Sequence, residues 1–263
     1  MAKKRGKRDR QQAGRKITAG SILRTIILLA AIGLFIFSAY QLYLIYHGRA
    51  EGDKEYNNLK DIGLVTTTED DGEERYTVDF DALREVNSDI VAWIRFDEPS
   101  VINYPVVKGK DNSEYLKKTI SGFDNTYGSI FMNCDNSGDF KDFNTIVYGH
   151  RMKNKTMFGA LDNYKERDFW KQYPYFYIYT PDGAELKYRI FANGTVNQES
   201  QSYQYGFADD ADKQAFLDYT KGALSYDNSV EVTISDRIVT LSTCTAASDS
   251  NRYIVCGVLA ETN

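Results

Sequence analysis

Residues 240–244 read Thr-Leu-Ser-Thr-Cys, and after a short polar loop residues 252–255 read Arg-Tyr-Ile-Val. Both stretches have the composition of short, largely apolar strands. Strands that follow each other along the chain are usually neighbours in a sheet. An antiparallel pair would therefore bring Cys244, at the end of the first strand, and Arg252, at the start of the second, to one rim.

Cys244 is a candidate nucleophile, because a thiol at a strand end beside a loop is more accessible than one in mid-strand. A free thiol has a pKa of about 8.5 and needs a nearby base or cation to react at neutral pH. His150, which ends another apolar strand, is the candidate base, since the other histidine, His47, borders the N-terminal apolar segment. Arg252 could stabilise an oxyanion, a contribution on the order of 10²–10³ in rate. The three residues predict a thiol-based acyl-transfer site.

The two other cysteines have no expected part in this chemistry. Cys256 lies in an apolar strand and is predicted to be buried. Whether Cys134 and Cys256 form a disulfide is left open, because sequence alone does not place two cysteines within bonding distance. No metal or cofactor is expected, since the chain has two histidines and the acidic run 69–74 lacks the spacing of a calcium loop.

The N-terminal segment is arranged like a membrane anchor. Residues 1–24 carry nine basic side chains and one acid, whereas residues 25–46 are uncharged and mostly apolar. A helix of roughly 20 residues crosses the ~30 Å hydrocarbon core of a membrane. The basic flank predicts a cytoplasmic N-terminus and a single span, with residues 47–263 outside the cell. A cleaved secretory signal is the less favoured alternative, because the apolar run is long and no clear cleavage site follows it.

The rest of the chain is acidic. The net charge is −5, residues 1–24 contribute +8, and residues 47–263 therefore carry −13. This balance argues against a nucleic-acid partner, whose phosphates require clustered positive charge. Residues 47–77 are polar and include the acidic run, so we expect an extracellular linker or stalk there, which can contain a short helix.

From residue 78 onward, short apolar runs separated by turn residues predominate. The expected strands are Val91–Phe96, Ile102–Val107, Asn144–Tyr148, Tyr175–Thr180, Glu185–Val196, Val230–Ile234, Arg237–Thr243 and Arg252–Leu259. The expected helices are Asp79–Val86, Ser113–Ile120, Met157–Tyr164, Glu166–Tyr173 and Asp209–Leu224. Short strands with few helices favour a closed or nearly closed, mostly β barrel over alternating βαβ units.

Residues 240–244, Arg252 and the upstream Tyr-Gly-His at 148–150 together resemble the signature of sortases. These are cysteine transpeptidases that attach proteins to the cell wall of Gram-positive bacteria. The resemblance covers roughly residues 78–263. It is closest to class B, because a helix precedes the first barrel strand and a long insertion, 197–229, contains another. It implies an eight-stranded sortase-type β-barrel with an N-terminal helix and a helical insertion between late strands.

The resemblance also implies roles for individual residues. Cys244 would be the nucleophile, His150 the acid and base, and Arg252 the stabiliser of the oxyanion or substrate, with Ser242 and Thr243 in contact with substrate. The enzyme would cleave the C-terminal sorting motif of a surface protein after its threonine. It would then transfer that protein through a thioester to an amine of peptidoglycan or its lipid-linked precursor. No acidic residue is identified as the partner that orients the histidine, and the oligomeric state is open.

Two other interpretations are open. The first is a different exported thiol acyltransferase, such as an L,D-transpeptidase or a papain-like peptidase, although the motifs of both differ from this sequence. An L,D-transpeptidase would place a His-Gly-Cys run at the nucleophile, which is absent, and a papain-like peptidase would have its cysteine before its histidine, whereas His150 precedes Cys244. The alternative from another class is a non-catalytic, membrane-tethered barrel that binds peptide or cell-wall polymer.

Overall fold

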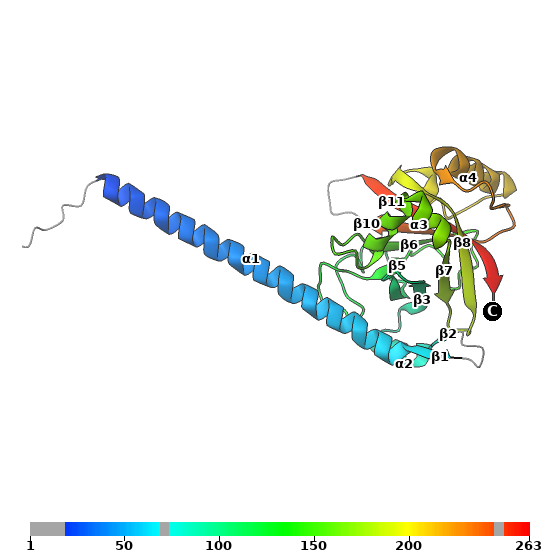
Figure 1. Cartoon of the computed structure of the whole chain (residues 1–263), viewed down its shortest axis with the longest axis horizontal. Helices are drawn as coiled ribbons and strands as arrows, with labels where there is room; N and C mark the ends of the chain where they lie inside the picture. Colours follow the sequence, from blue (N-terminus) through cyan, green and yellow to red (C-terminus); the bar gives the residue numbers. More distant parts are fainter. Residues whose placement is uncertain (1–18, 69–73, 245–249) are drawn as a thin grey trace, which may run out of the picture. The chain divides into compact units, whose positions relative to one another are not determined.

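The computed structural model describes residues 19–68, 74–244 and 250–263, and of residues 45, 68, 74 and 244 the backbone alone. It divides into two compact units, Met1–His47 and Gly48–Asn263. Helix α1 (Ala19–Gly63) begins in the first unit and ends in the second (Figure 1). The apolar part of α1, with a mean hydropathy of 2.3, is long enough to cross a membrane, a property that signal sequences share.

The second unit is built around a closed β-sheet. Neighbouring strands follow the order β11-β10-β6-β5-β4-β3-β7-β8, and pairing of β8 with β11 closes the ring. The eight strands are β3 (Ile90–Phe96), β4 (Asn103–Val107), β5 (Ile130–Met132), β6 (Asn144–His150), β7 (Tyr175–Tyr179), β8 (Glu185–Asn197), β10 (Ile238–Cys244) and β11 (Asn251–Thr262). The eight-stranded barrel implied by the resemblance is thus confirmed.

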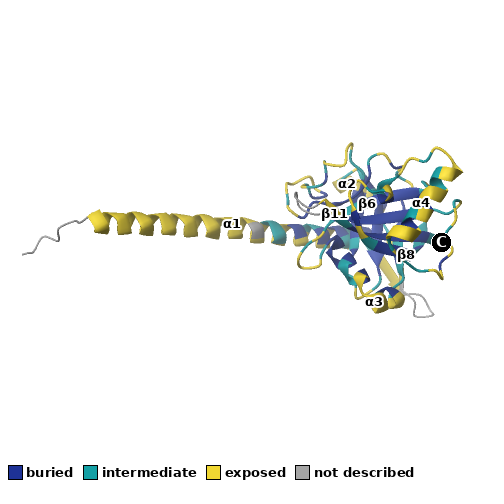
Figure 2. Cartoon of the chain, turned by 90° about the horizontal axis from the view of Figure 1, so that it is seen from above, coloured by how far each residue is buried: buried dark blue, intermediate teal, exposed yellow. Residues whose placement is uncertain are grey.

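Apolar side chains hold the barrel together in two clusters. The larger cluster includes Ile94 of β3 and Leu241 of β10, both fully buried. The smaller one joins Phe216 of α4 (Asp210–Ala223) to Phe191 of β8 and Ile254 of β11, so α4 covers part of the sheet. Figure 2 shows the strands as mostly buried, whereas the helices of this unit also carry exposed residues. Strands covered in this way do not show the regular alternation of buried and exposed residues that a half-exposed sheet has.

The short helices start where the sequence provides capping residues. The side chain of Asp79 accepts a hydrogen bond from the amide of Ala82 at the start of α2 (Phe80–Val86). Asp209 accepts from two amides at the start of α4. Aspartate is among the preferred N-cap residues because it satisfies amides that have no partner within the helix. The other helical segments are α3 (Arg167–Gln172) and the 3₁₀ helices η1 (Phe158–Lys165) and η2 (Gln201–Tyr203).

Residues 48–68 and 74–77, which belong to the expected linker, are folded as part of the second unit. The last part of α1 buries Tyr56 and Leu59 in the larger cluster. The helix is followed by a hairpin of β1 (Leu64–Thr68) and β2 (Glu74–Val78). Most of the acidic run, residues 69–73, lies outside the described residues, as does most of the basic tail.

A buried arginine connects this hairpin to the barrel. The guanidinium of Arg95 on β3 lies 4.0 Å from the ring centroid of Tyr76 on β2 and 4.4 Å from that of Tyr177 on β7. It also forms an ion pair of 2.9 Å with Asp97. A cation desolvated between two aromatic faces is stabilised by both rings. These contacts attach the hairpin to strands β3 and β7 of the sheet.

The helix expected at Ser113–Ile120 is wrong, because this segment forms turns. The carboxylate of Asp111 accepts hydrogen bonds from the amides of Ser113 and Glu114, which starts a turn. The chain then folds back, and the amide of Asn125 donates to the carbonyl of Lys117. Aspartate at a turn competes with continued helix by binding nearby amides.

The strand expected at Val230–Ile234 is also wrong. Val230 packs in the smaller cluster, but the following backbone turns, and the carboxylate of Asp236 accepts a hydrogen bond from the amide of Thr233. The strand of this insertion is instead β9 (Ser225–Tyr226), which pairs with β8 at Ala192 and Asn193. The sequence analysis also missed β5, which has three residues and so gives little periodic signal.

Candidate active site

Cys244 and His150 end two neighbouring strands of the barrel. Strands β6 and β10 are parallel, and their register pairs Cys244 directly with His150. The carboxyl ends of both strands therefore meet at one rim. The two residues are 94 positions apart in the sequence, so this proximity depends on the sheet order. The side chain of Cys244 is not described, so the accessibility of its thiol stays a prediction.

Arg252 lies at the same rim. Strand β11 is antiparallel to β10, and their register pairs Ser242 with Ile254. Two further residues along each strand reach Cys244 on β10 and Arg252 on β11. The structure thus brings the backbones of all three predicted catalytic residues to one end of three adjacent strands. Most of the polar loop that joins β10 to β11, residues 245–249, lies outside the described residues.

The backbone carbonyl of Leu116 orients the imidazole of His150. Because a carbonyl only accepts, Nε2 of His150 carries the proton and donates to the oxygen of Leu116. This hydrogen bond leaves Nδ1 to exchange a proton with a reacting group. Burial lowers the pKa of His150 below its ordinary value, although the Leu116 carbonyl opposes that shift.

Gly128 lies against both partners of this hydrogen bond. Its φ is +54°, and a Cβ at this position would lie 2.5 Å from the oxygen of Leu116 and 2.8 Å from Cδ2 of His150. Only a residue without a side chain lets the backbone approach so closely. The carbonyl of Gly128 accepts a hydrogen bond of 2.7 Å from the hydroxyl of Tyr56 on α1. The buried end of α1 therefore supports the segment that packs on the imidazole.

Arg252 is half-buried and is oriented by a glutamine. Its Nη2 donates a hydrogen bond of 2.9 Å to Oε1 of Gln198, and its Nη1 donates one of 3.0 Å to the carbonyl of Asn251. The amide of Gln198 in turn donates to the carbonyl of Ser250. The residue that follows β8 thus positions the guanidinium at the rim.

Ser242 and Thr243 differ in what their hydroxyl groups contact. Ser242 shares a hydrogen bond of 2.7 Å with the hydroxyl of Tyr203 on η2, and the ring of Tyr203 stacks with that of Tyr148 at 6.3 Å. The hydroxyl of Thr243 accepts from the amide of Tyr253 and donates to its carbonyl, both at 3.1 Å. Thr243 therefore holds β11 against β10, whereas Ser242 is one of the residues of an adjacent groove.

This groove has a volume of about 460 Å³ and lies beside the rim. Such a volume is within the range of about 300–1,000 Å³ that small-molecule sites occupy. Its lining is aromatic and polar, and it includes Leu116, the partner of His150, as well as Arg252. The lining residues are Asn112, Leu116, Phe131, Asn133, Asp135, Tyr148, Gln198, Glu199, Tyr203, Tyr205, Ser242 and Arg252.

The remaining cysteines lie outside this site. Cys134 and Cys256 are free thiols, so the disulfide left open by the sequence is absent from the described residues. Burial raises the pKa of Cys256 to about 12, consistent with the predicted structural role. Among residues 19–68, 74–244 and 250–263, no group of three or more His, Cys, Asp or Glu side chains is arranged to hold a metal ion.

The family model of the sortase domain matches residues 96–260. The chain belongs to the sortase family. It is 31% identical over 234 residues to sortase B of Staphylococcus aureus, covering 88% of this sortase and 93% of that protein. It is 30% identical over 243 residues to sortase B of Listeria monocytogenes, covering 91% and 97%.

A solved structure supports the same assignment. Sortase B from Bacillus anthracis in complex with AAEK1 matches with a TM-score of 0.72 and 30% identity, covering 82% of this chain and 100% of that one. The chain is therefore a class B sortase, and sortases are cysteine transpeptidases.

The sequence analysis missed three groups of this sortase site. The carbonyl of Leu116 is a backbone group, which no residue type signals. Gln198 and Tyr203 lie in the insertion after β8, where no strand or helix pattern indicates their direction. Asn197 and the turn that follows β8 indicate that the chain reverses there. They do not indicate that this end of β8 pairs with β11.

Proposed function

We propose that this protein is a membrane-anchored sortase that cleaves the C-terminal sorting motif of surface proteins after a threonine. It then transfers those proteins to an amine of peptidoglycan or its lipid-linked precursor. The observation that carries the proposal is the register that pairs Cys244 with His150 at the rim where Arg252 lies near the start of β11. Nucleophile, acid–base group and oxyanion partner are the three parts that acyl transfer by a thiol requires.

The first half of the reaction forms a thioester. The thiolate of Cys244 attacks the carbonyl carbon of the peptide bond after the threonine, and the oxygen of that carbonyl becomes an oxyanion near Arg252. The C–N bond then breaks, and protonated His150 donates its proton to the leaving amine. Since Nε2 of His150 is bonded to the Leu116 carbonyl, Nδ1 is the atom that transfers the proton.

The second half consumes the thioester. The acceptor amine attacks the same carbonyl carbon, and His150 accepts the proton that the amine loses. The C–S bond breaks, the new amide bond links the surface protein to the acceptor, and Cys244 leaves as thiolate. Arg252, oriented by Gln198, stabilises the oxyanion in both halves. The groove beside Ser242 is the proposed position of the motif.

Membrane attachment is the second part of the proposal. Residues 1–24 would stay in the cytoplasm, residues 25–46 would span the membrane, and residues 47–77 would lead to an extracellular catalytic domain at 78–263. The support is the length and hydropathy of the apolar part of α1 together with the basic residues that precede it. Protease accessibility of residues 47–263 on intact cells tests this orientation, and protection of these residues would contradict it.

Alkylation of the full chain in detergent tests the chemistry. We expect Cys244 to react fastest and its rate to fall in His150→Ala, because the thiolate depends on the imidazole. Cys134, which is partly exposed, and buried Cys256 are internal controls in the same sample. Peptides that contain a threonine should be cleaved by the wild type and not by Cys244→Ala. Cleavage by Cys244→Ala would refute the mechanism, and reaction of Cys244 at the rate of the denatured chain would favour a binding module.

A further inference from the structure

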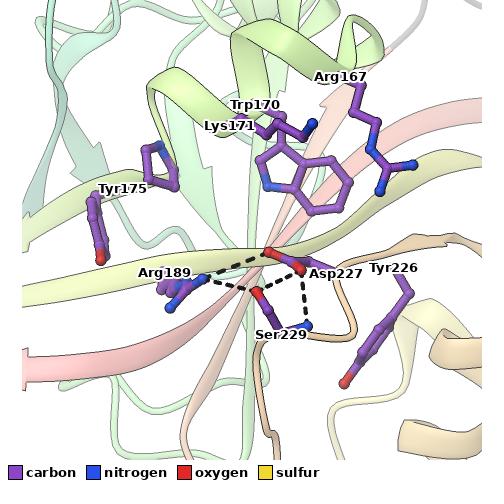
Figure 3. A pocket seen from close by; sticks show the side chains of 9 residues that line it. Arg167, Trp170, Lys171, Tyr175, Arg189, Tyr226, Asp227 and Ser229 are labelled. Carbon is purple, nitrogen blue, oxygen red and sulfur yellow. Dashed lines mark hydrogen bonds and ion pairs between the residues drawn. The ribbon is translucent and has the colours of Figure 1, made fainter.

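A second pocket lies beside the barrel, between α3 and strands β7, β8 and β9 (Figure 3). Its volume is about 330 Å³. Tyr175 on β7 pairs with Arg189 on β8, and both line the pocket. Arg189 precedes Val196, the β8 partner of Arg252, by seven residues. At about 3.3 Å per residue, this places the pocket roughly 20 Å from the rim along β8.

The pocket is positively charged. Arg167 and Lys171 from α3 and Arg189 from β8 line it, and the acid in the lining is Asp227. Nη2 of Arg189 lies 3.7 Å from the carboxylate of Asp227, which leaves a net charge of +2 on these four residues. Residues 47–263 as a whole carry −13. A basic pocket on an acidic domain concentrates anions locally.

Two of the three cations form no close ion pair with a described acidic residue. Within the described ranges, the side chains of Arg167 and Lys171 make no ion pair at 4.0 Å or less. Asp227 is ionised, because hydrogen bonds from Ser229 and the charges of Arg189 and Arg167 lower its pKa although burial opposes this. The count of +2 therefore holds at neutral pH.

Aromatic side chains form the walls of the pocket. In Figure 3 the indole of Trp170 lies over the side chains of Asp227 and Ser229. Its Nε1 donates a hydrogen bond of 3.1 Å to the carbonyl of Ile190, which fixes the ring. Tyr175 and Tyr226 line the pocket from β7 and β9. Rigid aromatic faces pack against the C–H groups of a sugar ring, while hydroxyl and carboxylate groups can bind its hydroxyls.

We propose that this pocket binds the phosphate ester of a sugar. A phosphomonoester carries about −1.5 to −2 at pH 7, which matches the net charge of the lining. Arginine and lysine are the side chains that bind phosphate best. The volume lies at the small end of the range for ligand sites, which suits one monosaccharide unit. The inference concerns binding alone and does not depend on the proposed transpeptidation.

Tryptophan fluorescence of the full chain in detergent tests the proposal. The chain has two tryptophans, and Trp93→Phe removes the one that is fully buried in the barrel core, leaving Trp170 as reporter. We expect saturable binding of N-acetylglucosamine 1-phosphate, with at least roughly tenfold weaker binding of N-acetylglucosamine or inorganic phosphate, because each lacks one half of the contacts. No response to the sugar phosphate, or equal affinity for inorganic phosphate, would overturn it.

Charge variants in the Trp93→Phe background separate this site from general attraction. Arg167→Gln and Lys171→Gln should each weaken binding about tenfold, as expected for loss of one charge-assisted hydrogen bond. Asp227→Asn should tighten it, an effect that a misfolded pocket would not give. Lys141→Gln removes the same charge from an exposed side chain outside the lining and should leave the affinity unchanged. Equal losses in all three cation variants would contradict the proposal.

Discussion

Nε2 of His150 donates a hydrogen bond to the backbone carbonyl of Leu116, a residue 34 positions earlier in the chain. Because a backbone carbonyl carries no charge, it fixes the tautomer and orientation of the imidazole without holding it protonated. A carboxylate in the same place would raise the pKa of the histidine. With this carbonyl, burial prevails and the pKa of His150 is lowered.

The first prediction concerns titration of His150. His47→Gln leaves it as the only histidine of the chain, so NMR of the imidazole reports a single group. We expect a midpoint below the ordinary value of about 6.5, because burial disfavours the charged ring. A midpoint above 6.5 would show that a charged partner dominates instead.

The same shift predicts how stability depends on pH. Between the lowered pKa of folded His150 and the ordinary value of the unfolded chain, the unfolded state binds more protons. Stability is therefore highest above about 6.5 and falls as the pH falls through that window. His150→Asn, which cannot titrate there, should lose this component in denaturant titrations at several pH values. An unchanged pH dependence in His150→Asn would assign it to other groups.

Gly128→Ala should reduce activity while the protein still folds. The added Cβ would collide with the oxygen of Leu116 and the ring of His150, and a shift of about 1 Å at a catalytic group can cost roughly 10²-fold in rate. Gly122→Ala is the matched control, because its φ of +85° imposes the same kind of strain but no atom lies within 4 Å of the new Cβ. Comparable kcat/KM values for the two variants would show that the close approach of Gly128 to Leu116 and His150 does not affect activity.

Gln198 should act on the reaction through Arg252. Gln198→Ala removes the acceptor of the 2.9 Å hydrogen bond from Nη2 and should lower kcat more than it raises KM, because the guanidinium loses its orientation. Gln198→Glu keeps an acceptor and should retain most of the rate. Arg252→Lys should lose activity even with Gln198 present, because an ammonium lacks the planar donors of arginine. If Gln198 has only a structural role, its substitutions should lower stability without this difference in rate between the two variants.

Tyr76 should stabilise the attachment of the β1–β2 hairpin. Tyr76→Leu removes one of the two rings that face the buried guanidinium of Arg95, which should cost about 0.5–2 kcal/mol of unfolding free energy. Thr77→Ala, at an exposed neighbour on the same strand, should change it by no more than about 0.5 kcal/mol. Chemical denaturation of both variants checks this, and equal effects would show that the cation–π contact adds nothing.

Local patterns were enough to predict several parts of the fold. The capping aspartates at 79 and 209 gave two helices within a residue of their observed bounds, and most barrel strands were predicted from short apolar runs.

The elements that the sequence predicted wrongly or missed have a common cause. The segment at 113–120 has helix-like composition, but several of its backbone hydrogen bonds connect it to residues 122–129 instead of forming a helical ladder. Strands β5 and β9 are too short to show a period and exist because a neighbouring strand pairs with them.

The sequence by itself determined the chemical groups: one thiol and one arginine that flank a short loop, one histidine at a strand end, and an uncharged N-terminal span. The tertiary structure decided which of these groups meet. It made β6 and β10 parallel neighbours, so that positions 150 and 244 pair, and it placed a carbonyl from residue 116 on the imidazole. The physical reason is that strand pairing and backbone hydrogen bonds connect distant segments, and their partners are chosen by burial of the whole barrel rather than by local composition.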